Sequence, residues 1–274
     1  MGYVGLAYPA ITWEVATDPR RFAADASVET VVEDLGRVGC MVCLWATLFL
    51  GLRLAPAQLL PAWFAEQRRA PEGRFDTVHK PANMVVSLIH SIVAVTVGST
   101  FLLPQLRELC AGEEEAWHQP MTAQTAWFIA MFQGYQLCDT GLGWAGQSPM
   151  HRLHHCAGLL AWGYPLFARS DATIVPVAYL LAEVANPFMH LRWILKYWDK
   201  HATTLGQINE ALCVVSWLVV RNIPELYVCW NHAWFEDELP LTWRLTVATG
   251  NCLTLIWSSQ IFKMLLRKFQ GKDL

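Results

Sequence analysis

A cluster of titratable residues lies between two long apolar stretches of the chain, in the segment GYQLCDTGLGWAGQSPMHRLHH. Tyr135 and Asp139 are four residues apart, and His151, His154 and His155 continue at helical spacing. Residues three or four apart share one face of an α-helix, so each set is expected to point one way. Ionisable groups are costly at membrane depth, so their presence beside apolar stretches indicates a functional site.

The chemistry of these residue types is that of proton and acyl transfer. Histidine titrates near neutral pH, so it can serve as a general base or as a nucleophile. A neighbouring carboxylate fixes the tautomer of the ring and stabilises the imidazolium. Amide formation from a thioester needs a base for the amine or a nucleophile that holds the acyl group. Either His154 or His155 can take either role, oriented by Asp139 or by Glu183.

Further polar residues recur at helical spacing in the neighbouring apolar stretches. In lipid such stripes turn toward the interior of a helical bundle, which predicts a shared amphipathic cavity open to a headgroup or a reactive chain end. Asn186 or Arg221 can bind a headgroup or stabilise an oxyanion, and Arg221 is expected to pair with Glu183. The residues expected to contact substrate are Tyr135, His90, Asn186, His190 and Arg221.

Composition indicates the class of protein in which these residues lie. The chain is 54% hydrophobic and only 16% charged, whereas soluble domains average about 25% charged residues. A spanning helix needs roughly 20 apolar residues. Seven segments qualify: 36–55, 82–103, 121–138, 151–170, 172–195, 207–231 and 241–265. We therefore predict an all-α polytopic transmembrane bundle of about seven helices, a six-helix core plus one N-terminal helix.

The charges of the loops predict the orientation and the domain organisation. Lys and Arg accumulate in short cytoplasmic loops, and here basic loops alternate with acidic clusters at 113–115 and 236–238. This pattern predicts a lumenal or external N-terminus and a cytosolic C-terminus. The expected parts are an extramembrane segment 1–35, a peripheral first helix and cytosolic loop 36–79, a membrane domain 80–265 and a basic cytosolic tail 266–274.

The order of these residues on successive helices resembles the TLC-domain family, which includes the ceramide synthases and smaller lipid-homeostasis proteins. The resemblance covers roughly residues 75–265 and rests on Tyr135 and Asp139, then His154-His155, then Glu183, Asn186-Pro187 and Arg192-Trp193. It implies that His154 and His155 serve acyl transfer from acyl-CoA to a sphingoid amine. Ceramide synthases carry two aspartates before a proline, whereas this chain has Glu183 and Asn186, as in the smaller members.

The resemblance implies a lipid-handling protein and leaves two functions open. One is an acyl-CoA-dependent N-acyltransferase whose catalytic residues are His154, His155, Asp139 and Glu183. The other is a non-catalytic protein that binds or senses lipid and regulates membrane composition or trafficking. No cofactor is expected, since acyl-CoA would be a co-substrate. The expected partners are membrane lipids, acyl-CoA or acyl chains and a second copy in a homodimer, without nucleic acid. The expected location is the endoplasmic reticulum or another internal membrane.

Two other classes fit parts of the sequence. His151, His154 and His155 have the spacing of one histidine box of a membrane hydroxylase or desaturase, but those enzymes carry several boxes and this chain has one. A zinc site of His151, His155, Asp139 and a residue of the fifth span suits the ligand chemistry, although no metal is expected. Pro187 and Pro224 are typical of the broken helices of transporters, but no inverted repeat supports transport.

Overall fold

The computed structural model describes residues 28–55, 57–59, 80–111, 121–143, 148–168, 174–227 and 241–270. These ranges contain helices and no strand, which confirms the all-α class. The helices are α2 (Val28–Leu54), η1 (Ala57–Leu59), α4 (Lys80–Ala111), α5 (Ala123–Gly143), α6 (Pro149–Ala168), α7 (Ile174–Glu183), α8 (Asn186–Tyr197), α9 (Thr204–Val215), the π-helical η4 (Ser216–Asn222) and α11 (Leu241–Phe269).

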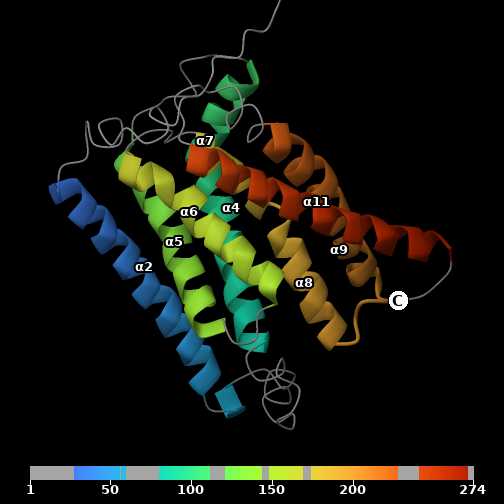
Figure 1. The fold of residues 1–274 in the computed structure, drawn as a ribbon. Helices are drawn as coiled ribbons and strands as arrows, with labels where there is room; N and C mark the ends of the chain where they lie inside the picture. Colours follow the sequence, from blue (N-terminus) through green and yellow to red (C-terminus); the bar gives the residue numbers. More distant parts are fainter. Residues whose placement is uncertain are drawn as a thin grey trace, which may run out of the picture.

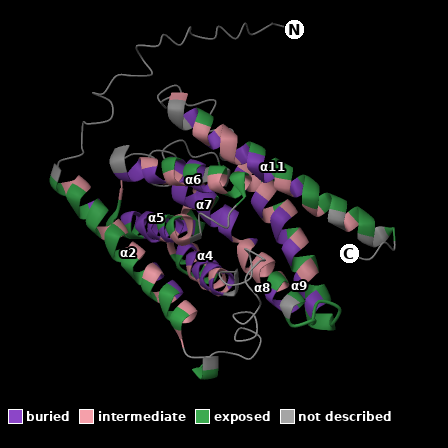
Figure 2. Cartoon of the chain, turned by 60° about the horizontal axis from the view of Figure 1, so that its bottom comes forward, coloured by how far each residue is buried: buried purple, intermediate pink, exposed green. Residues whose placement is uncertain are grey.

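The helices form one bundle with α4, α5 and α7 at its centre. Helix α2 lies along one outer side beside α5, and α11 lies on the other side, where it packs on α6 and η4 (Figure 1). Burial follows this order, because α5 and α7 are mostly buried while α2 and α11 expose much of their surface (Figure 2). The core joins Phe128, Phe132, Tyr179 and Leu180 of α5 and α7 with residues of α2 and α4.

The outer surface of the bundle is rich in large apolar side chains. A soluble protein rarely exposes so many, whereas a bilayer is an apolar solvent for them. Examples from four different helical segments are Val32, Leu44, Leu160, Ile223 and Phe262. Among the described residues, two helices are long and apolar enough to cross a membrane by themselves, Glu29–Leu54 within α2 and Ala82–Glu108 within α4. The remaining five predicted spans are shorter or more polar, so a count of seven stays a prediction.

The predicted span 172–195 is interrupted, which corrects the expectation of a continuous helix there, and the predicted span 207–231 changes its type of helix. In the first, α7 ends at Glu183 and α8 begins at Asn186 after a turn at 184–185. Pro187 follows at the start of α8, where a helix does not need its missing N–H. In the second, α9 passes into η4 and then into a helical segment at 223–227.

Helix α2 lies on the outside of the bundle (Figure 1), but its Trp45 and Phe49 side chains belong to the core. It begins at Val28, before the predicted start at residue 36. Trp45 is 3% exposed, and its indole N–H donates to the carbonyl of Met131 on α5 over 3.1 Å. The two helices approach closely at Gly134, since a Cβ there would lie 2.5 Å from the Cβ of Met41. This close approach needs a glycine.

Candidate functional site

The centre of the bundle contains a cavity of about 500 Å³ that is lined by residues of α4 to α11. The polar stripes predicted on separate helices meet there, because eight of the nine expected site residues line it. These eight are Tyr135, Asp139, His154, His155, Glu183, Asn186, His190 and Arg221. The ninth, His90, lies behind the wall. Apolar side chains of Phe132, Ala161, Trp162, Val175 and Val247 line the same cavity, so its interior is amphipathic.

One wall of the cavity carries the histidines of α6. The helix begins with Pro149, preceded by Ser148, whose hydroxyl accepts a hydrogen bond from the backbone N–H of His151 over 3.3 Å. The buried His155 places its Nε2 3.1 Å from Oδ2 of Asp139 on α5. A carboxylate in this position favours the tautomer with a proton on Nε2. The His155 ring is therefore oriented through Asp139, as the sequence analysis expected for one of the pair.

His154 lies beside His155 and borders α11. The centroids of the two imidazole rings are 5.4 Å apart. The indole of Trp257 meets His154 edge to face, with centroids 4.8 Å apart and planes at 78°. Trp257 is also 5.8 Å from the ring of His151. Packing against an aromatic ring restricts the rotamers of His154, so α11 helps to hold the histidine wall in place.

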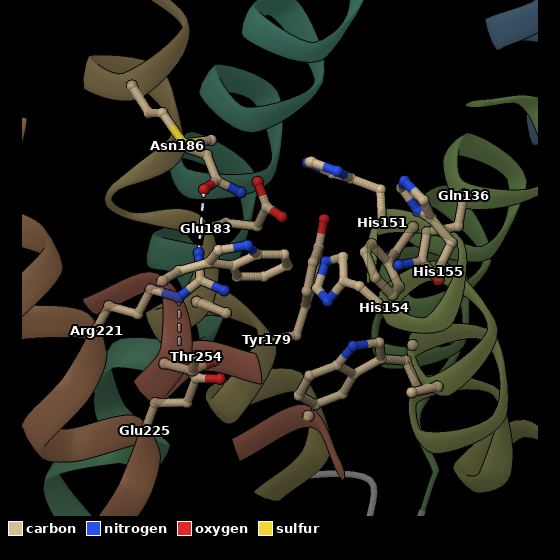
Figure 3. A pocket seen from close by; sticks show the side chains of 18 of the residues that line it. Gln136, His151, His154, His155, Tyr179, Glu183, Asn186, Arg221, Glu225 and Thr254 are labelled. Atoms are coloured by element: carbon tan, nitrogen blue, oxygen red, sulfur yellow. Dashed lines mark hydrogen bonds and ion pairs between the residues drawn. The ribbon is translucent and has the colours of Figure 1, made fainter. Parts of the chain in front are cut away.

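The opposite wall is built where α8 and η4 face each other (Figure 3). Arg221 of η4 donates from Nη1 to Oδ1 of Asn186 over 3.2 Å. Its Nε lies 3.3 Å from Oε2 of Glu225, and its guanidinium covers the ring of Trp217 at 4.3 Å. The expected pair of Arg221 with Glu183 is therefore wrong. Glu225 follows Arg221 by one helical turn, so the two side chains can meet without any change in the path of the backbone.

Glu183 lies beside this network, next to Asn186 (Figure 3). The side-chain carbonyl oxygen of Asn186 accepts a hydrogen bond from Arg221. Buried charges need partners, because desolvation of an unpaired ion is expensive. Even so, Oε2 of Glu183 and Nδ1 of His155 are buried without a hydrogen-bond partner among the described residues. Each wall thus contains buried polar atoms without a hydrogen-bond partner among the described residues.

His90 is 1% exposed and lies behind the cavity wall. Its ring stacks on that of Tyr135, with centroids 3.8 Å apart and planes at 9°. Its Nε2 is 2.6 Å from the hydroxyl of Tyr179, and the hydroxyl of Tyr135 is 2.8 Å from that of Ser87. His90 therefore touches two cavity-lining tyrosines but does not line the cavity itself.

Several lining residues were missed by the sequence analysis. They are Gln136, Tyr179, Trp217, Glu225, Asn251 and Trp257. Glu225 had a signal, since it follows Arg221 by one turn, and Gln136 precedes Asp139 by three residues. Trp257 had none, because the chain carries 14 Trp and nothing distinguishes this one by spacing.

The described residues include no group of three His, Cys, Asp or Glu side chains that could hold a metal ion. Asp139 lies within ion-pair distance of His155. His151 instead faces Ser148, with Nδ1 2.8 Å from the hydroxyl. The geometry of these residues is that of a hydrogen-bonded dyad.

A helical bundle with an apolar exterior and a buried amphipathic cavity defines a membrane protein that handles lipid-like molecules. Comparison with known families agrees, since the TLC domain matches residues 80–263. The chain belongs to the TLC-domain family, whose members are membrane proteins with lipid-related functions. No curated protein and no solved structure matches the chain. The subgroup within the family is therefore a matter for proposal.

Proposed function

We propose that this protein is an acyl-CoA-dependent N-acyltransferase in which His155 acts as the general base. The observation that supports it best is the His155–Asp139 dyad at 3.1 Å in the wall of the cavity. With the Nε2 proton directed to Asp139, Nδ1 of His155 retains a lone pair that has no partner among the described residues. That lone pair is free to accept a proton from a bound amine.

The reaction that this arrangement supports is a direct transfer. The amine nitrogen attacks the carbonyl carbon of the thioester, a C–N bond forms and the C–S bond breaks. The proton of the amine passes to Nδ1 of His155 and then to the leaving thiolate, which departs as the thiol of CoA. Asp139 stabilises the imidazolium that forms in between. His154, held by Trp257, borders the reacting groups from the same helix.

The apolar part of the cavity is the proposed site of the acyl chain. Small residues of α6, Ala157 and Ala161, line this part of the cavity. The polar network of Glu183, Asn186 and Arg221 would receive the headgroup of the acceptor. The membrane domain 80–265 would thus carry the site, at the cytosolic side of an internal membrane such as the endoplasmic reticulum, as the loop charges predict.

The test is amide formation by the full chain in lipid nanodiscs, measured by mass spectrometry with palmitoyl-CoA and a panel of long-chain amines that includes sphinganine. We expect Asp139→Asn and His155→Gln to lower the rate at least about 100-fold, as loss of general base catalysis does. Cys156→Ser is the matched control, because Cys156 is exposed on the same helix beside His155. Equal melting temperatures would show that the variants are folded.

Two outcomes would contradict the proposal. Full activity in His155→Gln would show that His155 is not the general base. No amide with any amine, together with bound phospholipid that the variants leave unchanged, would favour the lipid-binding or sensing function. The residue that favours this alternative is Asn186, which stands at a position of negative charge in ceramide synthases and here accepts a hydrogen bond from Arg221.

A further inference from the structure

Tyr179 is the residue of α7 whose phenol reaches the cavity between its two polar walls. The side chain is 2% exposed and lines the cavity. Figure 3 shows it between the histidines of α6 on one side and Glu183 on the other. Its ring is fixed by Phe132, whose centroid is 3.9 Å away, and by Phe128 at 5.4 Å. The hydroxyl therefore has a defined position with respect to a ligand in the cavity.

The only hydrogen bond to this hydroxyl among the described residues comes from His90 on α4. The His90 Nε2 lies 2.6 Å from the oxygen of Tyr179. The His90 ring is fully enclosed, stacked on Tyr135 at 3.8 Å and met edge-on by Trp45 of α2 at 5.1 Å. Because aromatic rings hold it on two sides, the imidazole cannot turn away from Tyr179.

The tautomer of His90 decides which way the hydroxyl proton points. Nδ1 of His90 is buried and has no hydrogen-bond partner among the described residues. A buried N–H without an acceptor is rarer and more costly than a buried lone pair without a donor. The proton therefore belongs on Nε2, which donates it to the oxygen of Tyr179. The oxygen then keeps its own proton free, and that proton points away from His90 toward the cavity.

We propose that the Tyr179 hydroxyl donates a hydrogen bond to the carbonyl oxygen of an acyl ligand, and that His90 is the positioning residue that directs it. The proposal rests on the acyl ligand of the proposed function. When an amine attacks the carbonyl carbon, negative charge develops on this oxygen, and a preoriented donor stabilises it. Trp45 takes part through its contact with His90, so a helix outside the matched TLC domain contributes to the site.

The first measurement concerns the tautomer and needs no ligand. Nitrogen NMR of the full chain in nanodiscs, with ¹⁵N-labelled histidine and His90→Gln for assignment, distinguishes a proton on Nε2 from one on Nδ1. We expect the proton of His90 on Nε2. A proton on Nδ1 would overturn the proposal, because the Tyr179 hydroxyl would then donate to His90 and not to a ligand.

The second measurement detects the ligand carbonyl by infrared spectroscopy with palmitoyl-CoA labelled with ¹³C at the thioester carbon. We expect Tyr179→Phe to shift the carbonyl band to higher wavenumber and to lower kcat roughly 100-fold with little change in KM. His90→Phe should shift the carbonyl band in the same direction. His90→Gln should keep the band at its wild-type position, since the glutamine amide can donate to the Tyr179 oxygen. Tyr227→Phe is the matched control, because Tyr227 is 60% exposed and does not line the cavity.

The outcomes separate this inference from the proposed function. A carbonyl band that Tyr179→Phe leaves unchanged, in a protein that binds and transfers the acyl group, would overturn the role of Tyr179 alone. Failure of the wild-type protein to bind palmitoyl-CoA would overturn the proposed function and with it the acyl carbonyl as the partner. In that case a proton on Nε2 would still show that Tyr179 donates into the cavity.

Discussion

Replacement of Gly134 by alanine tests the packing of α2 against α5. The added Cβ would lie 2.5 Å from the Cβ of Met41, 2.7 Å from its carbonyl carbon and 2.8 Å from the backbone nitrogen of Val42. Two of these atoms belong to the backbone, so the clash cannot be relieved by a rotamer change and the helices must separate. Overpacking of this kind costs about 1–3 kcal/mol.

Gly141→Ala is the control, since Gly141 lies on the same helix and a Cβ there meets nothing within 4 Å. Both substitutions gain about 1 kcal/mol of helix propensity. That gain cancels in the comparison, and the remaining difference is the overpacking cost. Thermal unfolding of the two variants in nanodiscs should place Gly134→Ala several degrees below Gly141→Ala. Equal melting temperatures would refute the close approach of α2 and α5.

Two further predictions concern buried polar groups of η4. Arg221→Met should destabilise the protein by about 3–5 kcal/mol, because it leaves Glu225 as an unpaired buried charge. The double variant Arg221→Met, Glu225→Leu should recover most of this loss in a thermal unfolding assay. No recovery would argue against the ion pair. Ser258→Ala should cost about 1–3 kcal/mol for each donor left unsatisfied, since the Ser258 hydroxyl accepts from Trp217 over 2.9 Å and from Asn222 over 2.7 Å. Ser259→Ala is its neutral control, because Ser259 is exposed and bonds only its own helix among the described residues.

The helical class and the inward direction of the polar residues could be predicted because both depend on local pattern. Apolar composition limits the chain to helices, and a spacing of three or four residues fixes which side chains share a face. Asp139 and His155 belong to neighbouring helices joined by a short connection, so their approach follows nearly from the sequence. The same reasoning places Glu183 and Asn186 on one side of their segment.

The choice between possible partners could not be predicted. Both Glu183 and Glu225 were possible partners of Arg221, and the structure pairs it with Glu225 one helical turn away. His90 was expected in the cavity because its stripe faces inward, but the depth of a side chain within a bundle depends on its neighbours. Trp45 and Tyr135 occupy the space around it, and neither contact has a sequence signal. Long-range packing of this kind also brings Trp45 of the outer helix α2 into the core.

The π-helical segment η4 restricts insertions and deletions of residues in this part of the chain. Cys213, Trp217, Arg221 and Glu225 all line the cavity although each is four residues from the next. In a regular α-helix such a series rotates by about 40° at every step, so its ends would face different directions. The wider turns of η4 counter this rotation and keep the four side chains aligned. Loss of a single residue from 216–222 would turn the residues after it by about 100° and remove Glu225 from the cavity. Natural variants of this protein should therefore vary in side chain at these positions more readily than in number of residues.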